Sequence, residues 1–493
     1  MPFDLERYAF LALFFALFAG LPAVGAIRAA ELSAPPDHHE PMSRRLVVVG
    51  LLVSLTGVLS MGTGAWLARE DSRYGAIEAF GMLLITFIGA GLLVAGLGSL
   101  PSWLLELSDR YTKRLPLPFR LAVRDLVRRR GRTVIAITLA MMATAFAVAL
   151  TVIAVGETTQ SRAQYSPRAR PGSLLVRPSA LFTQSFSAAD AGTVRAAIER
   201  EFPGVPIAQS ERPSDEFRHL SARAENVEMP EEAVYWYQAI GDEKLLRYLT
   251  GDQSAPYDED TAVVITSTDV KVDSVELSYM IHQNDTATTT KTVRAGIART
   301  ADPRMETIFI PSKIVQDLGY RLQPAELIID PALHRVTVQE QERLDDRLDD
   351  AVAETYVERG FEASTWWLPV VAAALLTALA CALTTGFGSA ANARPARLLR
   401  RPGNGPGVAF RWFCAFRAGL AALCATVLGA VAGCPAGMLL LWPLTVPTTW
   451  DEPARVPFET PWPAIVAVVA VLPLLAAAIG ALLAREQAHT AER

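Results

Sequence analysis

The stretch TVIAITLAMMATAFAVALTVIAVG, residues 133–156, decides the class of fold to which this chain belongs. It contains no Asp, Glu, Lys or Arg. At about 1.5 Å of rise per residue, a helix of this length crosses the roughly 30 Å hydrocarbon layer of a membrane. A globular core does not require so long an uninterrupted apolar run, so we interpret the stretch as a transmembrane helix.

Six further uncharged runs of similar length make seven in a chain of 493 residues. They lie at Tyr8–Ile27, Leu46–Ala68, Ala79–Leu105, Ala363–Ala393, Ala418–Trp450 and Thr460–Ala484. The mean hydropathy of +0.25 is high for a chain with 20% charged residues, so the apolar residues are segregated. This excludes a soluble enzyme and predicts a polytopic α-helical membrane protein with about seven transmembrane helices and one α+β extracytoplasmic domain.

The sequence divides the chain into five predicted segments. They are three transmembrane helices in 1–105, a basic amphipathic cytoplasmic helix in 106–132, a transmembrane helix in 133–156, an extracytoplasmic α+β domain in 157–363, and three transmembrane helices with a basic cytoplasmic loop at 388–411 in 364–493. The middle region carries about 35 acidic against 22 basic residues, whereas the whole chain has a net charge of only -5. The remainder is therefore basic, as expected of loops that stay in the cytoplasm.

The most basic segment, SDRYTKRLPLPFRLAVRDLVRRRGR at 108–132, sets the predicted orientation. Loops rich in Lys and Arg remain inside, so the acidic domain that follows the next helix lies outside. Alternation of the helices then places the N-terminus outside and the C-terminus in the cytoplasm of a cell (plasma) membrane protein. The alternative for Tyr8–Ile27 is a signal peptide ending at LPAVGA, but Asp4 and Glu6 precede it where a signal peptide needs positive charge.

The middle region has both helical and strand patterns. Helices are predicted at SAADAGTVRAAIEREF (187–202), DEKLLRYLTG (242–251) and VQEQERLDDRLDDAVA (338–353), the last opened by a capping box at Thr337 and Glu340. Strands are predicted at AVYWYQAIG (233–241), TAVVITS (261–267), SVELSYMI (274–281), KTVRAGIA (291–298) and AELIID (325–330). The mixture predicts an α+β domain.

An amphipathic helix is predicted just before the 133–156 run. Its apolar positions recur at helical spacing and are Phe119, Ala122, Val123, Leu126 and Val127. The other faces carry Arg120, Arg124, Asp125, Arg128, Arg129 and Arg130. We expect this helix to lie along the inner membrane surface with its cations towards anionic headgroups; the alternative is a basic juxtamembrane loop without regular structure.

Three glycines recur every fourth residue in the Ala418–Trp450 run: Gly429, Gly433 and Gly437. A stripe without side chains lets another helix approach closely. The spacing is equally compatible with packing inside the helical bundle and with a subunit interface.

Motifs for catalysis and cofactor binding are absent from the sequence. There is no phosphate-binding G-x-x-x-x-G-K-[ST], no G-x-S-x-G and no G-x-G-x-x-G. The acidic group Asp345, Asp346, Asp349 and Asp350 is interleaved with arginines and is interpreted as a solvated helix face rather than a metal site. We therefore expect no catalytic, metal or cofactor-binding residue in this chain, and no nucleic-acid partner.

Taken together, three stretches resemble the FtsX/MacB-type permease family of ABC transporters, in its tandem actinobacterial form. They are LPFRLAVRDLVRRRGRTVIAITLAMMATAFAVAL (117–150), AIGDEKLLRYLTG (239–251) and GSAANARPARLLRRPG (388–403). The resemblance implies a permease that transmits the ATP-driven motion of a partner ATPase to an extracytoplasmic domain. It also implies that the ATPase docks on the loop with Arg394, Arg397, Arg400 and Arg401, and that ATP binds to that partner.

The order of the helices departs from the tandem pattern. Residues 1–105 repeat the closing part of the second half, so the chain is expected to lack the first helix and first outer domain of a complete tandem permease. A second permease chain that supplies them, an extracytoplasmic protein and membrane lipids are the further partners expected. The rival hypothesis is a membrane receptor or scaffold that works without an ATPase and whose basic loops only maintain topology.

Overall fold

The structure is a computed structural model in which two compact units can be recognised. The helical unit comprises Met1–Gln164 and Ala363–Arg493, and the sheet unit comprises Tyr165–Glu362. The residues described are 44–69, 76–111, 117–128, 130–179, 185–214, 220–224, 235–280, 289–300, 302–348, 352–387, 408–446 and 455–490. The hydrophobic run Tyr8–Ile27 and the loop with Arg394, Arg397, Arg400 and Arg401 lie outside these ranges.

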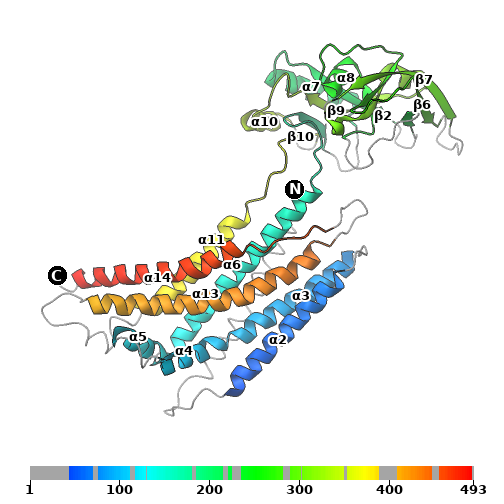
Figure 1. Ribbon diagram of the computed structural model, residues 1–493. Helices are drawn as coiled ribbons and strands as arrows, with labels where there is room; N and C mark the ends of the chain where they lie inside the picture. The colour runs from blue at the N-terminus through cyan, green and yellow to red at the C-terminus, as the bar shows by residue number, and fades with distance from the viewer. Residues whose placement is uncertain are drawn as a thin grey trace. The chain divides into compact units, whose positions relative to one another are not determined.

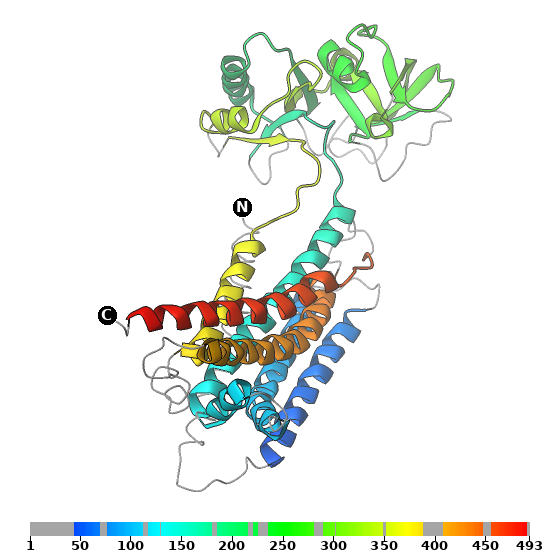
Figure 2. The ribbon, with the colours of Figure 1, turned by 60° about the vertical axis from the view of Figure 1, so that its left-hand side comes forward.

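Within the described residues the helical unit contains eight helices (Figures 1 and 2). They are α2 (Arg44–Leu67), α3 (Ala76–Leu97), α4 (Leu100–Tyr111), α5 (Leu117–Arg128), α6 (Arg130–Gln164), α11 (Trp367–Phe387), α13 (Val408–Leu444) and α14 (Trp462–Thr490). Six spans are long and apolar enough to cross a membrane: Val47–Leu67, Ile77–Leu105, Thr133–Gln164, Trp367–Thr385, Phe410–Leu444 and Trp462–Ala484. They correspond to six of the seven predicted runs and suggest a membrane-embedded protein.

Helix α13 is central to the packing of this unit because it contacts α6, α14, α11, α2 and α3. Small residues permit the closest approaches. In the hairpin of α2 and α3, a Cβ added to Gly57 would stand 2.6 Å from the carbonyl oxygen of Gly89, and one added to Gly89 would stand 2.6 Å from that of Gly57. The two backbones therefore touch, as is usual where membrane helices associate through small residues.

Several helix boundaries differ from the hydropathy pattern. The third run is interrupted by a turn at Gly98–Ser99, after which Pro101 occupies the first turn of α4, where proline is tolerated. Helix α6 continues to Gln164, beyond the last residue of the 133–156 run. Helix α13 begins at Val408, so charged Arg411 and Arg417 belong to the same helix as the uncharged run. The backbone hydrogen bonds of these helices therefore continue past the ends of the uncharged runs.

The sheet unit contains ten strands among its described residues, in the order β10-β1-β9-β2-β4-β8-β5-β7-β6-β3. Their bounds are β1 Leu174–Pro178, β2 Ile207–Pro213, β3 Leu220–Ala224, β4 Gln238–Gly241, β5 Ala262–Thr266, β6 Ser274–Tyr279, β7 Thr289–Arg299, β8 Thr307–Pro311, β9 Leu322–Ile329 and β10 Ala353–Val357. Pairs β4–β8 and β5–β7 are parallel and the others antiparallel. The sheet is thus mixed.

In the described part of this unit, four short helices accompany the sheet: α7 (Ala188–Glu201), α8 (Glu243–Thr250), α9 (Ser312–Asp317) and α10 (Val338–Asp345). Helix α7 packs against Leu174, Val176 and Leu327, whereas α8 packs against Leu175 and Ile328. Because successive side chains of a strand point to opposite faces, these two helices cover opposite faces of the same strands. The result is a region of α/β type with apolar contacts on both faces of the sheet.

Most local predictions for this region are confirmed. Helix α8 ends at Gly251, whose φ of 71° is the left-handed conformation that glycine adopts easily. The capping box of Thr337 and Glu340 opens α10. The predicted extent of that helix is wrong, because α10 ends at Asp345 and Ala353–Val357 forms β10 beside β1. Ala353 and Val357 are buried there, so pairing with β1 overrides the helical pattern of the preceding acidic residues.

Candidate functional site

Helix α5 carries the amphipathic pattern predicted for 106–132. Ala122, Val123 and Leu126 are buried within the protein. The ring of Phe119 lies 4.7 Å from that of Phe416 on α13, measured between centroids. Val127, partly buried, packs against the main apolar cluster of the helical unit. The apolar face that the sequence assigns to the membrane surface is therefore covered by other helices.

Asp125 of α5 and Arg417 of α13 form a buried ion pair. Only 4% of Asp125 and 1% of Arg417 is exposed. The guanidinium Nη1 of Arg417 donates a hydrogen bond to Oδ2 of Asp125. Ionised groups are removed from water only where a partner compensates them, and removal of one partner strands the other charge. Arg417 lies in a helix long enough to span a membrane, where an ionisable residue marks a functional position by default.

The predicted glycine stripe of α13 faces α6 of the same chain. A Cβ added to Gly429 would stand 2.7 Å from Cβ of Thr144, and one added to Gly437 would stand 2.8 Å from Cβ of Val152. At Gly433 the added atom would stand 2.4 Å from a backbone oxygen, that of Ala145. These contacts account for the stripe by packing inside the bundle.

Replacing Gly433 with alanine is expected to destabilise the helical unit by about 1–3 kcal/mol, because backbone rather than a movable side chain blocks the new methyl group. Gly62 on α2 is the matched control, since an added Cβ there meets nothing within 4 Å. Gly62→Ala should be neutral or stabilise by up to about 1 kcal/mol. Thermal unfolding of both variants in one detergent checks this; equal melting temperatures would refute the close contact.

Arg455 ties together three segments at one end of the helical unit. Its guanidinium donates to the carbonyl oxygen of Trp442 at 2.9 Å, to that of Ala68 at 3.1 Å and to Oγ1 of Thr445 at 3.0 Å. It also lies over the Trp442 ring, 4.7 Å from the centroid. A cation at the C-terminal ends of α2 and α13 interacts favourably with both helix dipoles.

In the sheet unit, Glu358 joins the chain that arrives from α6 to the chain that leaves towards α11. Its fully buried carboxylate accepts hydrogen bonds from the hydroxyl of Tyr165 and from the backbone N–H groups of Arg168 (2.8 Å) and Gly360 (2.9 Å). Its own backbone N–H donates to the carbonyl oxygen of Ser173 at 3.0 Å. We call this arrangement the Glu358 clasp.

The electrostatics of the clasp favour an ionised carboxylate. Burial raises the pKa of Glu358, but hydrogen bonds from Tyr165, Arg168, Gly360 and Tyr356 outweigh burial and leave its pKa below the usual value. Burial and the adjacent carboxylate raise the pKa of the Tyr165 phenol, which keeps it a neutral donor at physiological pH. The incoming and outgoing chains are therefore held by a charge-assisted network.

No protein-family model matches this chain. A search of curated proteins likewise finds no match.

Neither the ion pair of Asp125 and Arg417 nor the Glu358 clasp has an obvious signal in the sequence. The sequence pattern places Asp125 on the polar face of its helix, and Arg417 stands directly before an uncharged run. Glu358 lies in the charged stretch YVERGFE, whose composition is that of an exposed turn. Among the described residues no group of three or more His, Cys, Asp and Glu side chains could hold a metal ion.

Proposed function

We propose that this chain is the permease subunit of an ABC transporter, of FtsX/MacB type, in a cell membrane. It couples a partner ATPase to an extracytoplasmic domain, which is the sheet unit. The resemblance implies one of three tasks for the transporter: export, the handling of lipids or lipoproteins, or mechanotransmission. The N-terminus is outside and the C-terminus cytoplasmic.

The observation that carries this proposal is the Glu358 clasp. The sheet unit is a single insertion, Tyr165–Glu362, in the chain between α6 and α11. Because both connections meet at one buried carboxylate, a change in the separation of the two helix ends acts on one hydrogen-bonded point of the domain. Contacts that differ between two states are what any such transmission requires.

The ion pair of Asp125 and Arg417 supports the cytoplasmic half of the proposal. Helix α5, with its exposed Arg124 and Arg128, is joined to α13 by a buried charge pair and apolar contacts rather than resting loosely on a bilayer. Force applied to α5 by a cytoplasmic partner would therefore reach α13, and through the glycine stripe α6. Helix α6 in turn precedes the sheet unit.

Co-purification tests the ATPase partner. Arg394, Arg397, Arg400 and Arg401 should be replaced together by serine, with replacement by lysine as the control that keeps the positive charge needed for topology. The wild-type chain should retain a protein that carries a G-x-x-x-x-G-K-[ST] phosphate loop and hydrolyses ATP. The amount of ATPase that co-purifies should fall at least tenfold in the serine variant and much less in the lysine variant. Absence of any ATPase from the wild-type complex would instead favour the receptor or scaffold.

A further inference from the structure

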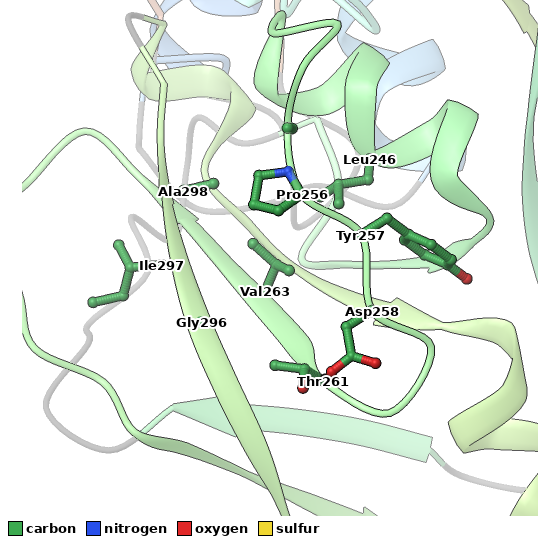
Figure 3. A pocket seen from close by; sticks show the side chains of 10 residues that line it. Leu246, Pro256, Tyr257, Asp258, Thr261, Val263, Gly296, Ile297 and Ala298 are labelled. Atoms are coloured by element: carbon green, nitrogen blue, oxygen red, sulfur yellow. Dashed lines mark hydrogen bonds between the residues drawn. The ribbon is translucent and has the colours of Figure 1, made fainter.

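A pocket of about 220 Å³ opens in the sheet unit between strands β5 and β7 and the segment that follows α8 (Figure 3). It is lined by Leu246, Ala255, Pro256, Tyr257, Asp258, Thr261, Val263, Gly296, Ile297 and Ala298. Drug-sized ligands occupy roughly 300–1,000 Å³, so this pocket suits one group of a ligand rather than a whole one.

Small residues of β7 lie beneath the pocket. Gly296 and Ala298 are two apart in the strand and therefore share a face, and Gly296 pairs with Val263 of β5. A Cβ added to Gly296 would meet nothing within 4 Å, so the space above it is empty. A glycine inside a strand weakens the strand and often marks the close approach of a ligand or another backbone.

The carboxylate of Asp258 and the hydroxyl of Thr261 are already hydrogen-bonded. Oδ2 of Asp258 accepts a hydrogen bond from the hydroxyl of Thr261 at 2.6 Å, and Oδ1 accepts one from the backbone N–H of Asp260 at 3.3 Å. The remaining lining is aliphatic or aromatic, with Leu246 and Ala255 buried. An apolar occupant therefore gains burial without breaking the hydrogen bonds of Asp258 and Thr261.

Negative charge dominates the rim. Asp258 is exposed, and the hydrogen bond from Thr261 holds its pKa below the usual value. Burial raises the pKa of Tyr257, and Glu259, Asp242, Glu243 and Glu211 raise it further. The ammonium group of Lys313 pairs with Asp260 at 3.0 Å and Glu259 at 3.7 Å, and Lys313 and Arg294 act on Asp258 only as more distant charges. No lysine, arginine or histidine is among the lining residues.

We propose that this pocket binds the apolar group of a cationic amphiphile, with the hydrocarbon or aromatic part above Gly296 and the ammonium group beside Asp258. Apolar burial supplies the affinity, and the acidic rim selects the sign of the charge. The assignment does not depend on an ATPase partner.

The test uses the full chain in lipid nanodiscs and three water-soluble probes of one size: 2-phenylethylammonium, 2-phenylethanol and phenylacetate. Saturation-transfer NMR gives a dissociation constant for each, with empty nanodiscs as the blank. The cation should bind at least threefold more tightly than the alcohol, and the anion most weakly. No saturable binding of the cation, or equal binding of cation and anion, would overturn the proposal.

Two variants locate the site. Gly296→Leu fills the pocket and should abolish binding of the cation, whereas Gly192→Leu, at another glycine of this unit with nothing within 4 Å of an added Cβ, should not. Asp258→Asn keeps the shape of the side chain. It should weaken binding of the cation about three- to tenfold and leave binding of the alcohol unchanged. Unaltered cation binding in Gly296→Leu, or in Asp258→Asn, rules out this pocket as the site.

Discussion

Replacing Asp125 with alanine is expected to lower the free energy of unfolding by about 3–5 kcal/mol. Only 1% of Arg417 is exposed. The substitution therefore leaves its guanidinium buried without its carboxylate partner. Arg417→Ala should have a similar effect, because it leaves the Asp125 carboxylate buried. Denaturant unfolding of the purified chain in detergent, followed by far-ultraviolet circular dichroism, measures the loss.

Arg124→Ala is the matched control for this prediction. Arg124 neighbours Asp125 on α5 but is exposed, so its removal should change stability by no more than about 0.5 kcal/mol. The double variant Asp125→Leu with Arg417→Met should recover most of the stability, because apolar residues of similar volume avoid the desolvation penalty of the pair. If Asp125→Ala were as stable as Arg124→Ala, the pair would have no structural role.

Replacing Glu358 with leucine is expected to destabilise the sheet unit by about 3–5 kcal/mol, because several donors lose one shared acceptor and each unpaired buried donor costs about 1–3 kcal/mol. These donors are the hydroxyl of Tyr165 and the backbone N–H groups of Arg168 and Gly360. Hydrogen exchange should accelerate at 165–173 and 356–360. The control is Glu354→Leu, an exposed position on β10, which should leave exchange in these segments unchanged.

Acid should weaken the same clasp. The pKa of Glu358 is lowered in the folded chain, and an unfolded glutamate titrates at about pH 4.3. Its ionised form therefore stabilises the fold fully above that value, and the contribution disappears as pH falls through the lower folded pKa. The stability difference between the wild type and Glu358→Gln should be constant from pH 7 to pH 5 and shrink below about pH 4. A difference that does not change with pH would show that ionisation of Glu358 is unimportant.

The sequence predicts those elements of the fold that depend on residues close together in the chain. Hydropathy alone locates the six described membrane-length helices, and the turn at Gly251 and the capping box at Thr337 locate helix ends, because those interactions join residues a few positions apart. Strands such as β1 and β10 are not predicted, since each is stabilised by partners up to about 180 residues away in the chain.

The candidate sites are still less visible in the sequence. Asp125 and Arg417 are 292 positions apart, and each has an unremarkable local context. Glu358 reaches Tyr165 across 193 positions. Nothing in the pattern around either pair distinguishes a buried charge from an exposed one, because burial depends on which helices and strands pack together.

The sequence by itself determined the class of this protein, the apolar helices and the single acidic insertion between the fourth and fifth hydrophobic runs, because these follow from the transfer of side chains between water and hydrocarbon. Tertiary structure alone decided that the apolar face of α5 packs on α13, that the glycine stripe faces α6, and that Glu358 links the chain entering the sheet unit to the chain leaving it. The physical reason is that desolvation and hydrogen-bond pairing act between residues that only the folded chain brings together.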